Sequence, residues 1–318
     1  MNMFWDWRRR TASFQAGEID NSPAQPVQKV FSLLDTIKER CYSFLDINSC
    51  SNNELEDYSA MSKSPLISVV IPAHNEEEYL PSCLEAVKRA AAALPYSDND
   101  ESCSVEVVVV ANRCTDRTAG IAEHFGAVVI QNDARCIAQV RNAGVRASHG
   151  GIVVTVDADS VMSEDALREV VEMLGSGKFI GGGTPVRFSR MSLGIFCSAL
   201  YVAWNLIPVM MRNKAALSGG MFWFRRDDFD RIGGFDESLV SLEDMDFAVR
   251  LHKLGLSAGK KFGTLKRSHI VTSSRKFDTF GDWYLIRNRK LTKRIFTGRD
   301  REAADEFYYN VREGKPST

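Results

Sequence analysis

The chain has 318 residues, of which 44% are hydrophobic and 25% are charged, and its formal net charge is −1. This composition is typical of a globular protein with room for one large α/β domain and an appendage, or for two small domains. The near-neutral charge argues against a protein that binds nucleic acid by neutralising phosphates. The seven cysteines lack the paired spacings of zinc or redox motifs, so we expect reduced thiols in a cytoplasmic protein.

The first 65 residues differ from the rest and are expected to form an N-terminal extension. Residues 1–10 contain aromatic residues and three arginines, but no apolar run of signal-peptide length. A disordered start is expected there, and the alternative is contact with a membrane surface. Apolar residues at helical spacing predict one amphipathic helix over 26–46, and these are Val30, Phe31, Leu34, Ile37, Cys41, Phe44 and Leu45. Residues 48–65 are rich in Ser, Asn and Glu, which predicts a linker.

Apolar runs and helical periodicities alternate from residue 66 to residue 156. Strands are predicted over 66–71, where Pro72 is expected to end the strand, and over 105–110, 127–130 and 152–156. Helices are predicted between them over 76–93, 116–125 and 137–147. The strands are almost uninterruptedly apolar, as burial on both faces requires. This alternation predicts a parallel sheet with helical crossovers.

The second half of the chain begins less regularly, with strands predicted over 179–188 and 217–225. Between them, residues 193–211 carry no charge, and the length of this segment makes it a transmembrane candidate. A spanning helix would separate the strand at 152–156 from the acidic residues at 243–246, although the motifs below indicate one domain, so we reject it. We expect a buried helix, and the alternative is a helix docked at the membrane interface.

Two further helices are predicted toward the C-terminus. One starts at Asp244, buries Phe247, Leu251 and Leu254 on one side, and stops at Gly255. The other covers 285–295 and is rich in Arg and Lys. A solvated face is the default expectation for such a helix, and the alternatives are closure over a bound ligand or contact with anionic lipid.

Two carboxylates follow the strand at 152–156. Asp157 and Asp159 are two residues apart, so they would share one face if the strand continued, and both can converge at its carboxyl end if it ends at Val156. The carboxyl ends of parallel strands are where open α/β sheets bind ligands. Two carboxylates there predict a site for a divalent cation that completes its shell with substrate phosphates. The alternative is that these residues only form a turn or cap a helix.

Four blocks of residues occur in an order that resembles glycosyltransferase family 2, the GT-A-type nucleotide-sugar transferases. The blocks are VIPAHNEE at 70–77, VANRCTDRT at 110–118, VRNAG at 140–144 with VDAD at 156–159, and SGGMF at 218–222 with IGGFDE at 232–237 and LEDMD at 242–246. The resemblance covers roughly residues 66–290, and the N-terminal 65 residues lie outside it.

The resemblance implies that the first block binds the donor nucleotide. The backbone of the loop at Pro72 and Ala73 would contact the nucleobase, and Glu76 would contact a ribose hydroxyl. The alternative is that Asn75 and Glu76 only cap the next helix.

The second block departs from the family pattern. Ala111 stands where an acid commonly recognises the nucleobase, and Arg113 replaces the usual glycine. The base is therefore left open, and Asn112 is a candidate to recognise it. Asp116 matches the pattern, with a structural helix cap as the alternative.

The third block supplies the expected phosphate and metal ligands. Arg141 is suited to a phosphate or a base edge, because a guanidinium matches planar acceptors. The resemblance implies that Asp159 binds Mg²⁺ or Mn²⁺ and that Asp157 supports the ribose or the metal. The ion would neutralise charge on the departing nucleoside diphosphate.

The fourth block carries the expected catalytic base. The resemblance implies that Asp244 removes the proton of the acceptor hydroxyl, with Glu243 as the reserve candidate. A helix cap is the alternative, because acids are favoured at a helix N-terminus. Downstream, Arg275 would lie over the diphosphate, and His269 is a candidate further metal ligand, with simple packing as its alternative.

These observations together predict an α/β protein with a GT-A-like, Rossmann-type sheet of mostly parallel strands flanked by helices. We expect an extension over 1–65, a transferase domain over 66–295 that divides into a nucleotide-sugar half (66–160) and an acceptor half (161–295), and a tail over 296–318. The predicted activity is inverting, metal-assisted sugar transfer from a nucleotide-sugar to a hydroxyl of a glycan, a lipid-linked acceptor or a small molecule. A cytoplasmic location is expected, with a peripheral position at the inner face of the membrane as a further expectation.

Two alternative functions remain. A nucleotidyltransferase should carry a Gly-rich basic loop after its first strand, which residues 72–77 do not resemble. A non-catalytic nucleotide-sugar-binding protein is compatible with Ala111, but the acids at 157, 159, 243 and 244 together favour an enzyme.

Overall fold

The computed structural model describes residues 67–94, 105–213, 220–296 and 298–304. The expected extension over 1–65, with its helix and linker, lies outside these residues. The same holds for residues 217–219 of one predicted strand and for the end of the C-terminal tail.

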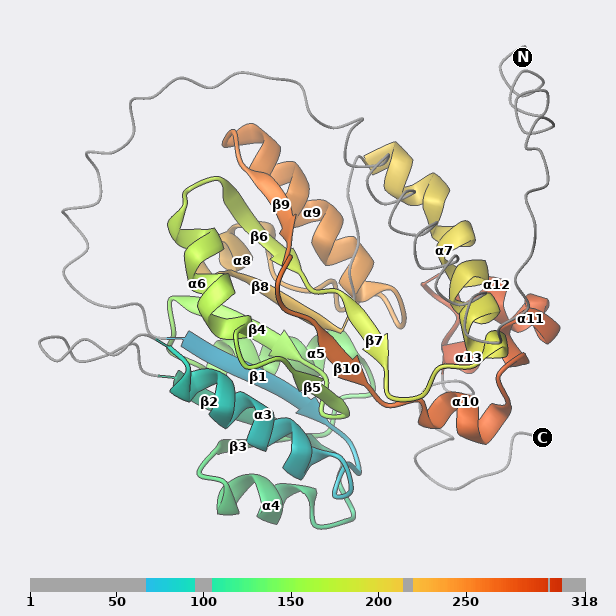
Figure 1. Cartoon of the computed structure of the whole chain (residues 1–318), viewed down its shortest axis with the longest axis horizontal. Helices are drawn as coiled ribbons and strands as arrows, with labels where there is room; N and C mark the ends of the chain where they lie inside the picture. Colours follow the sequence, from blue (N-terminus) through green and yellow to red (C-terminus); the bar gives the residue numbers. More distant parts are fainter. Residues whose placement is uncertain (1–66, 95–104, 214–219, 297, 305–318) are drawn as a thin grey trace, which may run out of the picture. The chain divides into compact units, whose positions relative to one another are not determined.

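A mixed sheet forms the centre of the described part of the chain (Figure 1). In spatial order its seven described strands are β3 (Val128–Asn132), β2 (Val105–Asn112), β1 (Ile67–Ala73), β4 (Ile152–Val156), β8 (Met221–Arg225), β6 (Phe179–Gly183) and β9 (Lys261–Thr264). Neighbouring strands are parallel except at β8, which runs antiparallel to both β4 and β6. Strands β1, β4 and β8 are buried because helices cover both faces of the sheet, whereas the edge strand β3 is partly exposed.

The two helical layers bury two separate sets of apolar side chains. One layer packs on Ile67, Val69 and Ile71 and consists of α3 (Leu80–Ala92), α4 (Thr118–His124) and α6 (Ala166–Gly175). The other packs on Val70 and Val108 and consists of α5 (Ile137–Ala147), α8 (Arg226–Ile232) and α9 (Glu243–Ser257). Successive residues of β1 therefore face opposite layers, as strand geometry requires. The predicted α/β class with a mostly parallel sheet is confirmed.

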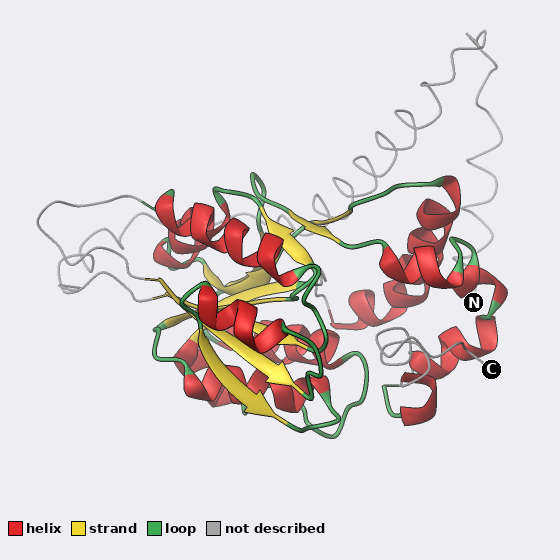
Figure 2. Ribbon diagram, turned by 90° about the horizontal axis from the view of Figure 1, so that it is seen from below, coloured by secondary structure: helices red, strands yellow, loops and turns green. Residues whose placement is uncertain are grey.

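A smaller sheet connects this body to a group of helices (Figure 2). Its three described strands are β5 (Ser160–Met162), β10 (Ile270–Thr272) and β7 (Val186–Phe188). The chain leaves β7 into α7 (Leu193–Asn213), and it leaves β10 into α10 (Arg275–Phe280), α11 (Tyr284–Arg287), α12 (Arg289–Ile295) and α13 (Arg301–Ala304).

Several predicted element boundaries were wrong. Pro72 does not end the first strand, because β1 stays paired with β2 as far as Ala73. The single strand predicted over 179–188 is two strands in different sheets, because β6 pairs with β8 and β9 whereas β7 pairs with β10. The predicted helix over 285–295 is interrupted at Asn288, whose backbone leaves the helical region. The helix α6 was not predicted.

The helix expected over 193–211 is present as α7, but its expected burial is wrong for one face. Ile195 is fully buried, whereas Leu193, Trp204 and Met211 are largely exposed. In the described part of the chain, no helix combines the length and apolarity needed to cross a membrane.

Gly182 lies where no larger residue fits. A Cβ atom added there would meet the Gly263 carbonyl oxygen at 2.2 Å and the Trp223 ring at 2.3 Å. The buried Trp223 indole is held in place by donating to the Gly183 carbonyl at 2.9 Å. We therefore expect Gly182→Ala to lower the free energy of unfolding by about 1–3 kcal/mol through overpacking, as measured by urea denaturation.

Gly120→Ala is the matched control, because a Cβ at Gly120 in α4 meets nothing within 4 Å. This substitution should raise stability by about 0.5–1 kcal/mol, since alanine favours the helix. Equal effects of the two substitutions would contradict the packing argument.

Candidate active site

A cavity of about 430 Å³ lies where β1, β2 and β4 end. Seven of the residues that the sequence analysis assigned to the site line this cavity, namely Pro72, Ala73, Asn112, Arg141, Asp157, Glu243 and Asp244. The carboxyl ends of parallel strands meet at one edge of a sheet, which explains why residues distant in sequence converge there.

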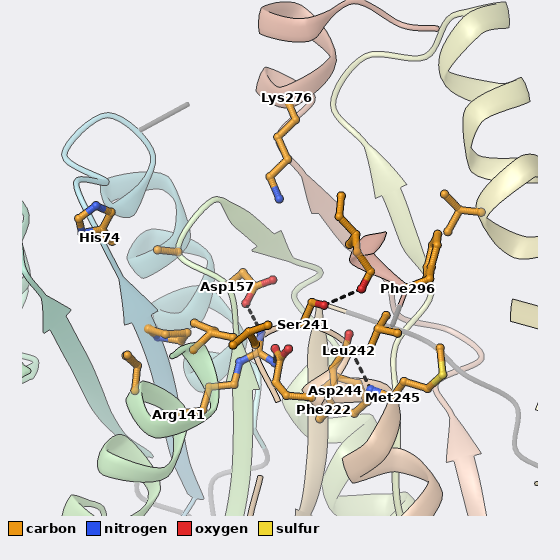
Figure 3. A pocket seen from close by; sticks show the side chains of 18 of the residues that line it. His74, Arg141, Asp157, Phe222, Ser241, Leu242, Asp244, Met245, Lys276 and Phe296 are labelled. Carbon is orange, nitrogen blue, oxygen red and sulfur yellow. Dashed lines mark hydrogen bonds and ion pairs between the residues drawn. The ribbon is translucent and has the colours of Figure 1, made fainter. Parts of the chain in front are cut away.

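Arg141 links the two acidic motifs of this cavity (Figure 3). It projects from α5 and donates to Asp157 at 2.7 Å and to Glu243 at 3.2 Å. Its guanidinium also lies 5.6 Å from the centre of the Phe235 ring. Burial alone would lower the pKa of Arg141, but the carboxylates of Asp157 and Glu243 outweigh it and raise the pKa. Arg141 is therefore a permanent buried cation between two acids.

The start of α9 presents Glu243 and Asp244 to the cavity. Leu242 precedes them with φ at +61°, a left-handed conformation that is strained for a leucine. Glu243 is buried, while Asp244 is half-buried and accepts the Met245 backbone N–H at 2.7 Å. Burial raises the pKa of both carboxyls, and the guanidinium of Arg141 opposes this rise. A carboxylate with a raised pKa is better suited to accept a proton.

A second cluster brings Glu76, Asp159 and Arg275 together beside the cavity. Arg275 binds both oxygens of Glu76, at 2.6 and 2.5 Å, and lies 3.2 Å from Asp159. Its guanidinium also stacks 4.9 Å from the Tyr79 ring centre. Asp157 and Asp159 thus belong to different ion pairs, one with Arg141 and the other with Arg275.

The second motif block is fixed to its surroundings. The side-chain N–H₂ of Asn112 donates to the backbone oxygens of Asn132 at 3.1 Å and Ala134 at 2.8 Å. Asp116 accepts the backbone N–H and the hydroxyl of Thr118 at 3.0 and 2.6 Å, which is an Asx-type turn just before α4. Arg113 has φ at +48°, which explains why a glycine is common at this position in the family pattern.

His269 lies away from the two aspartates. Its ring is 3.2 Å from the guanidinium of Arg187, and its backbone oxygen accepts the N–H of Ser163. Ser273, four residues later, donates its N–H to the backbone oxygen of Asp159 at 3.0 Å. Among the described residues, no group of three or more His, Cys, Asp and Glu side chains is placed to hold a metal ion.

Several cavity residues were not assigned from the sequence. Lys276 points toward Asp157 from the other side of the cavity, and His74 lies at the end of β1 (Figure 3). His74 stands inside the block at 70–77, and Lys276 directly follows Arg275, so their positions next to assigned residues were the available signal. An apolar wall comes from distant helices, with Val202, Leu206, Leu285, Ile295 and Phe296 as its members. No short motif marks these residues.

A family model described as glycosyl transferase family 2 matches residues 68–233, which is more than half of the chain. The chain belongs to glycosyl transferase family 2. It is 26% identical over 212 residues to a probable glycosyltransferase of Bacillus subtilis, covering 61% of this chain and 48% of that protein. It is 27% identical over 205 residues to glycosyltransferase AglE of Haloferax volcanii, covering 62% of this chain and 64% of that protein. This family 2 chain therefore spans about half to two thirds of the length of these relatives.

A solved structure shows the same fold as this family 2 chain. It is a mannosyltransferase from Pyrobaculum calidifontis in complex with GDP-Man and Mn²⁺. The TM-score is 0.50 at 17% sequence identity, with 88% of this chain and 79% of that chain covered. The predicted GT-A-like architecture is confirmed by this likeness.

Proposed function

We propose that this protein is an inverting glycosyltransferase that moves a sugar from a nucleotide-sugar to an acceptor hydroxyl. The observation that carries the proposal is the convergence of Arg141, Asp157, Glu243 and Asp244 on one cavity in a family 2 chain. The donor nucleotide is proposed to bind at Pro72, Ala73 and Asn112, with Glu76 and Asp116 at its margin. Family membership favours this activity over the nucleotidyltransferase alternative.

A divalent ion is proposed at Asp157 and Asp159. Carboxylate oxygens fit Mg²⁺ or Mn²⁺, which hold few protein ligands and take the rest from substrate phosphates and water. The mannosyltransferase with the same fold is in complex with Mn²⁺, which supports this assignment. When bound, the ion supplies neutralisation of the charge on the leaving nucleoside diphosphate. His269 is a weaker candidate ligand because it lies beside Arg187.

Asp244 is the proposed general base. Its carboxylate would accept the proton of the acceptor hydroxyl while that oxygen bonds to the anomeric carbon and the bond to the diphosphate breaks on the opposite side. The anomeric configuration is then inverted. Glu243 is the reserve candidate, because its carboxylate is already paired with Arg141 at 3.2 Å. Arg275 and Lys276 are the cations proposed to contact the diphosphate.

Donor binding measured by calorimetry tests this proposal most directly. We expect one of a panel of UDP-, GDP- and dTDP-sugars to bind in the presence of Mn²⁺. Asp159→Ala should weaken that binding at least about tenfold, which corresponds to about 1.4 kcal/mol, because a metal ligand is lost. Asp165→Ala is the matched control, since this half-exposed acid pairs only with Arg168 among its described ion pairs.

The possible results separate the functions. Binding that is lost in Asp159→Ala and kept in Asp165→Ala supports the metal-assisted site and identifies the base. Absence of binding to every donor by the folded protein would overturn the transferase proposal. Donor binding without any sugar transfer would favour the non-catalytic alternative.

A further inference from the structure

One face of α7 is apolar and exposed. Leu193, Leu200, Trp204, Ile207 and Met211 are each between 40% and 75% exposed. Their spacings of seven, four, three and four residues place them on a single stripe of the helix. Contiguous exposed apolar surface of this kind marks an interaction site. We call these five residues the α7 stripe.

The other face of α7 belongs to the protein interior. Ile195 and Ser198 are fully buried, and Val202 and Leu206 line the cavity of the active site. The α7 helix therefore lies between the cavity and the binding partner of the α7 stripe. A helix with its side chains is about 10 Å in diameter, so the two are close.

The turn before α11 is anchored to α7 and extends its apolar surface. Ser198 donates to the Asp282 backbone oxygen at 2.7 Å, and Arg190 binds the Asp282 carboxylate at 2.7 Å. A Cβ atom on Gly194 would lie 2.9 Å from the Trp283 ring nitrogen, so the two helices approach closely. Trp283 is 38% exposed. A second tryptophan thus lies next to the α7 stripe.

The segment that follows is strongly basic. Residues 283–299 contain six Arg and Lys residues and no Asp or Glu. Arg287, Arg289, Lys290 and Lys293 are exposed on α11 and α12, while Leu291 and Ile295 point inward. Figure 1 shows α7, α11 and α12 grouped on one side of the sheets. An apolar stripe and a cluster of cations therefore lie in the same part of the molecule.

We propose that this surface docks on an anionic lipid bilayer, with the α7 stripe and Trp283 inserted among the lipids and the cations on their headgroups. A helix that lies in the membrane interface combines an apolar face, tryptophan and neighbouring basic residues in this way. Cations close to the bilayer add electrostatic attraction to acidic headgroups. A symmetric dimer through the same surface is disfavoured, because it would bring the two basic segments together.

Docking would determine where the acceptor comes from. This inference rests on the proposed function. The cavity would lie one helix away from the bilayer, with the apolar side chains of Val202 and Leu206 on the membrane side. An acceptor whose hydroxyl is carried by a lipid would reach the cavity without leaving the membrane.

Flotation with lipid vesicles tests the apolar part of this proposal. We expect the full chain to float with vesicles of phosphatidylcholine and phosphatidylglycerol. Trp204→Ser combined with Met211→Ser should lower the partition coefficient at least about tenfold, because two inserted side chains are lost. Val128→Ser combined with Leu256→Ser is the control, since these apolar residues of β3 and α9 are also exposed, at 49% and 56%.

The charged part is tested separately. Replacing Arg289, Lys290 and Lys293 by Gln should lower binding to the anionic vesicles at least about tenfold, since each cation near the surface contributes. Replacing Lys178, Lys253 and Lys261 by Gln makes the same change in net charge at exposed sites elsewhere, and should leave binding unchanged.

Three results would overturn the proposal. The first is absence of flotation by the unaltered chain, and the second is equal loss in the test and control variants. The third is a concentration-dependent dimer that the α7 variant dissociates, without any flotation, because the stripe then binds a second copy. Calorimetry of UDP and GDP binding to the same variants, in the presence of Mn²⁺, tests the proposed function separately from membrane docking. Docking can fail while nucleotide binding persists, and nucleotide binding can fail while docking persists.

Discussion

Asp244→Asn is expected to lower the rate of sugar transfer by about 10²–10⁴-fold while leaving donor binding intact. Asparagine has the same shape and can still accept the Met245 N–H, but it cannot take a proton from the acceptor. Steady-state kinetics should therefore show a fall in kcat, and calorimetry should show an unchanged donor affinity. This combination separates a base from a residue that only positions the donor.

Asp246→Asn is the matched control for this experiment. Asp246 lies two residues further along α9 and forms an ion pair with Arg250 at 2.6 Å. It does not line the cavity. Its substitution should leave kcat essentially unchanged. Similar losses in both variants would indicate damage to α9 and would contradict a specific role for Asp244.

The same assignment predicts a pH dependence. Burial raises the pKa of Asp244 above its ordinary value of 3.8, although Arg141 opposes the rise. A base works only when ionised, so kcat/KM should increase with pH as the carboxyl loses its proton. The acidic limb of the profile is expected above pH 3.8 and belongs to Glu243 and Asp244 as a pair, because the two groups interact. A limb at or below the ordinary value would contradict the buried geometry.

Arg141→Met is expected to lower the free energy of unfolding by about 3–5 kcal/mol, which is typical when one partner of a buried ion pair is removed. Methionine occupies a similar volume but leaves the buried Glu243 without the cation that lies 3.2 Å away. Chemical denaturation at neutral pH measures the loss. The same variant should also bind the donor poorly, because Asp157 loses its partner at 2.7 Å.

Two further variants make this prediction specific. Adding Glu243→Gln to Arg141→Met should restore part of the stability, since the double variant no longer buries an unpaired carboxylate at position 243. Arg146→Met, on the same helix, breaks an exposed pair with Glu237 at 3.3 Å and should cost about 1 kcal/mol or less. If Arg146→Met were as damaging as Arg141→Met, the role of the buried charge would be refuted.

Much of the fold and part of the site could be predicted from local patterns. The helix over 137–147 and the strand over 152–156 have the bounds that were expected. Pro72, Arg141, Asp157, Glu243 and Asp244 line one cavity because strand ends in a parallel sheet must meet at one edge. Periodicity and motif order carry this information without any knowledge of packing.

Other features depend on contacts between distant segments. The split of 179–188 into two strands follows from which neighbours β6 and β7 find, namely β8 and β9 for one and β10 for the other. The pairing of Asp159 with Arg275, 116 positions later in the chain, follows from the position of β10 beside β5. Such pairings are set by the sheet, so no local pattern reveals them.

The sequence by itself determined the family, the α/β class and the acids that the chemistry needs, because these are encoded in residue types at short spacings. Only the tertiary structure decided the ion pairs of those acids, in which Asp157 pairs with Arg141 and Asp159 pairs with Arg275. It also decided that α7 lines the cavity with one face and exposes an apolar stripe with the other. Residues 193–211 of α7 carry no charge, so no charged face marks which side of the helix is turned to solvent. The exposed face is therefore set by the elements that pack against the opposite face.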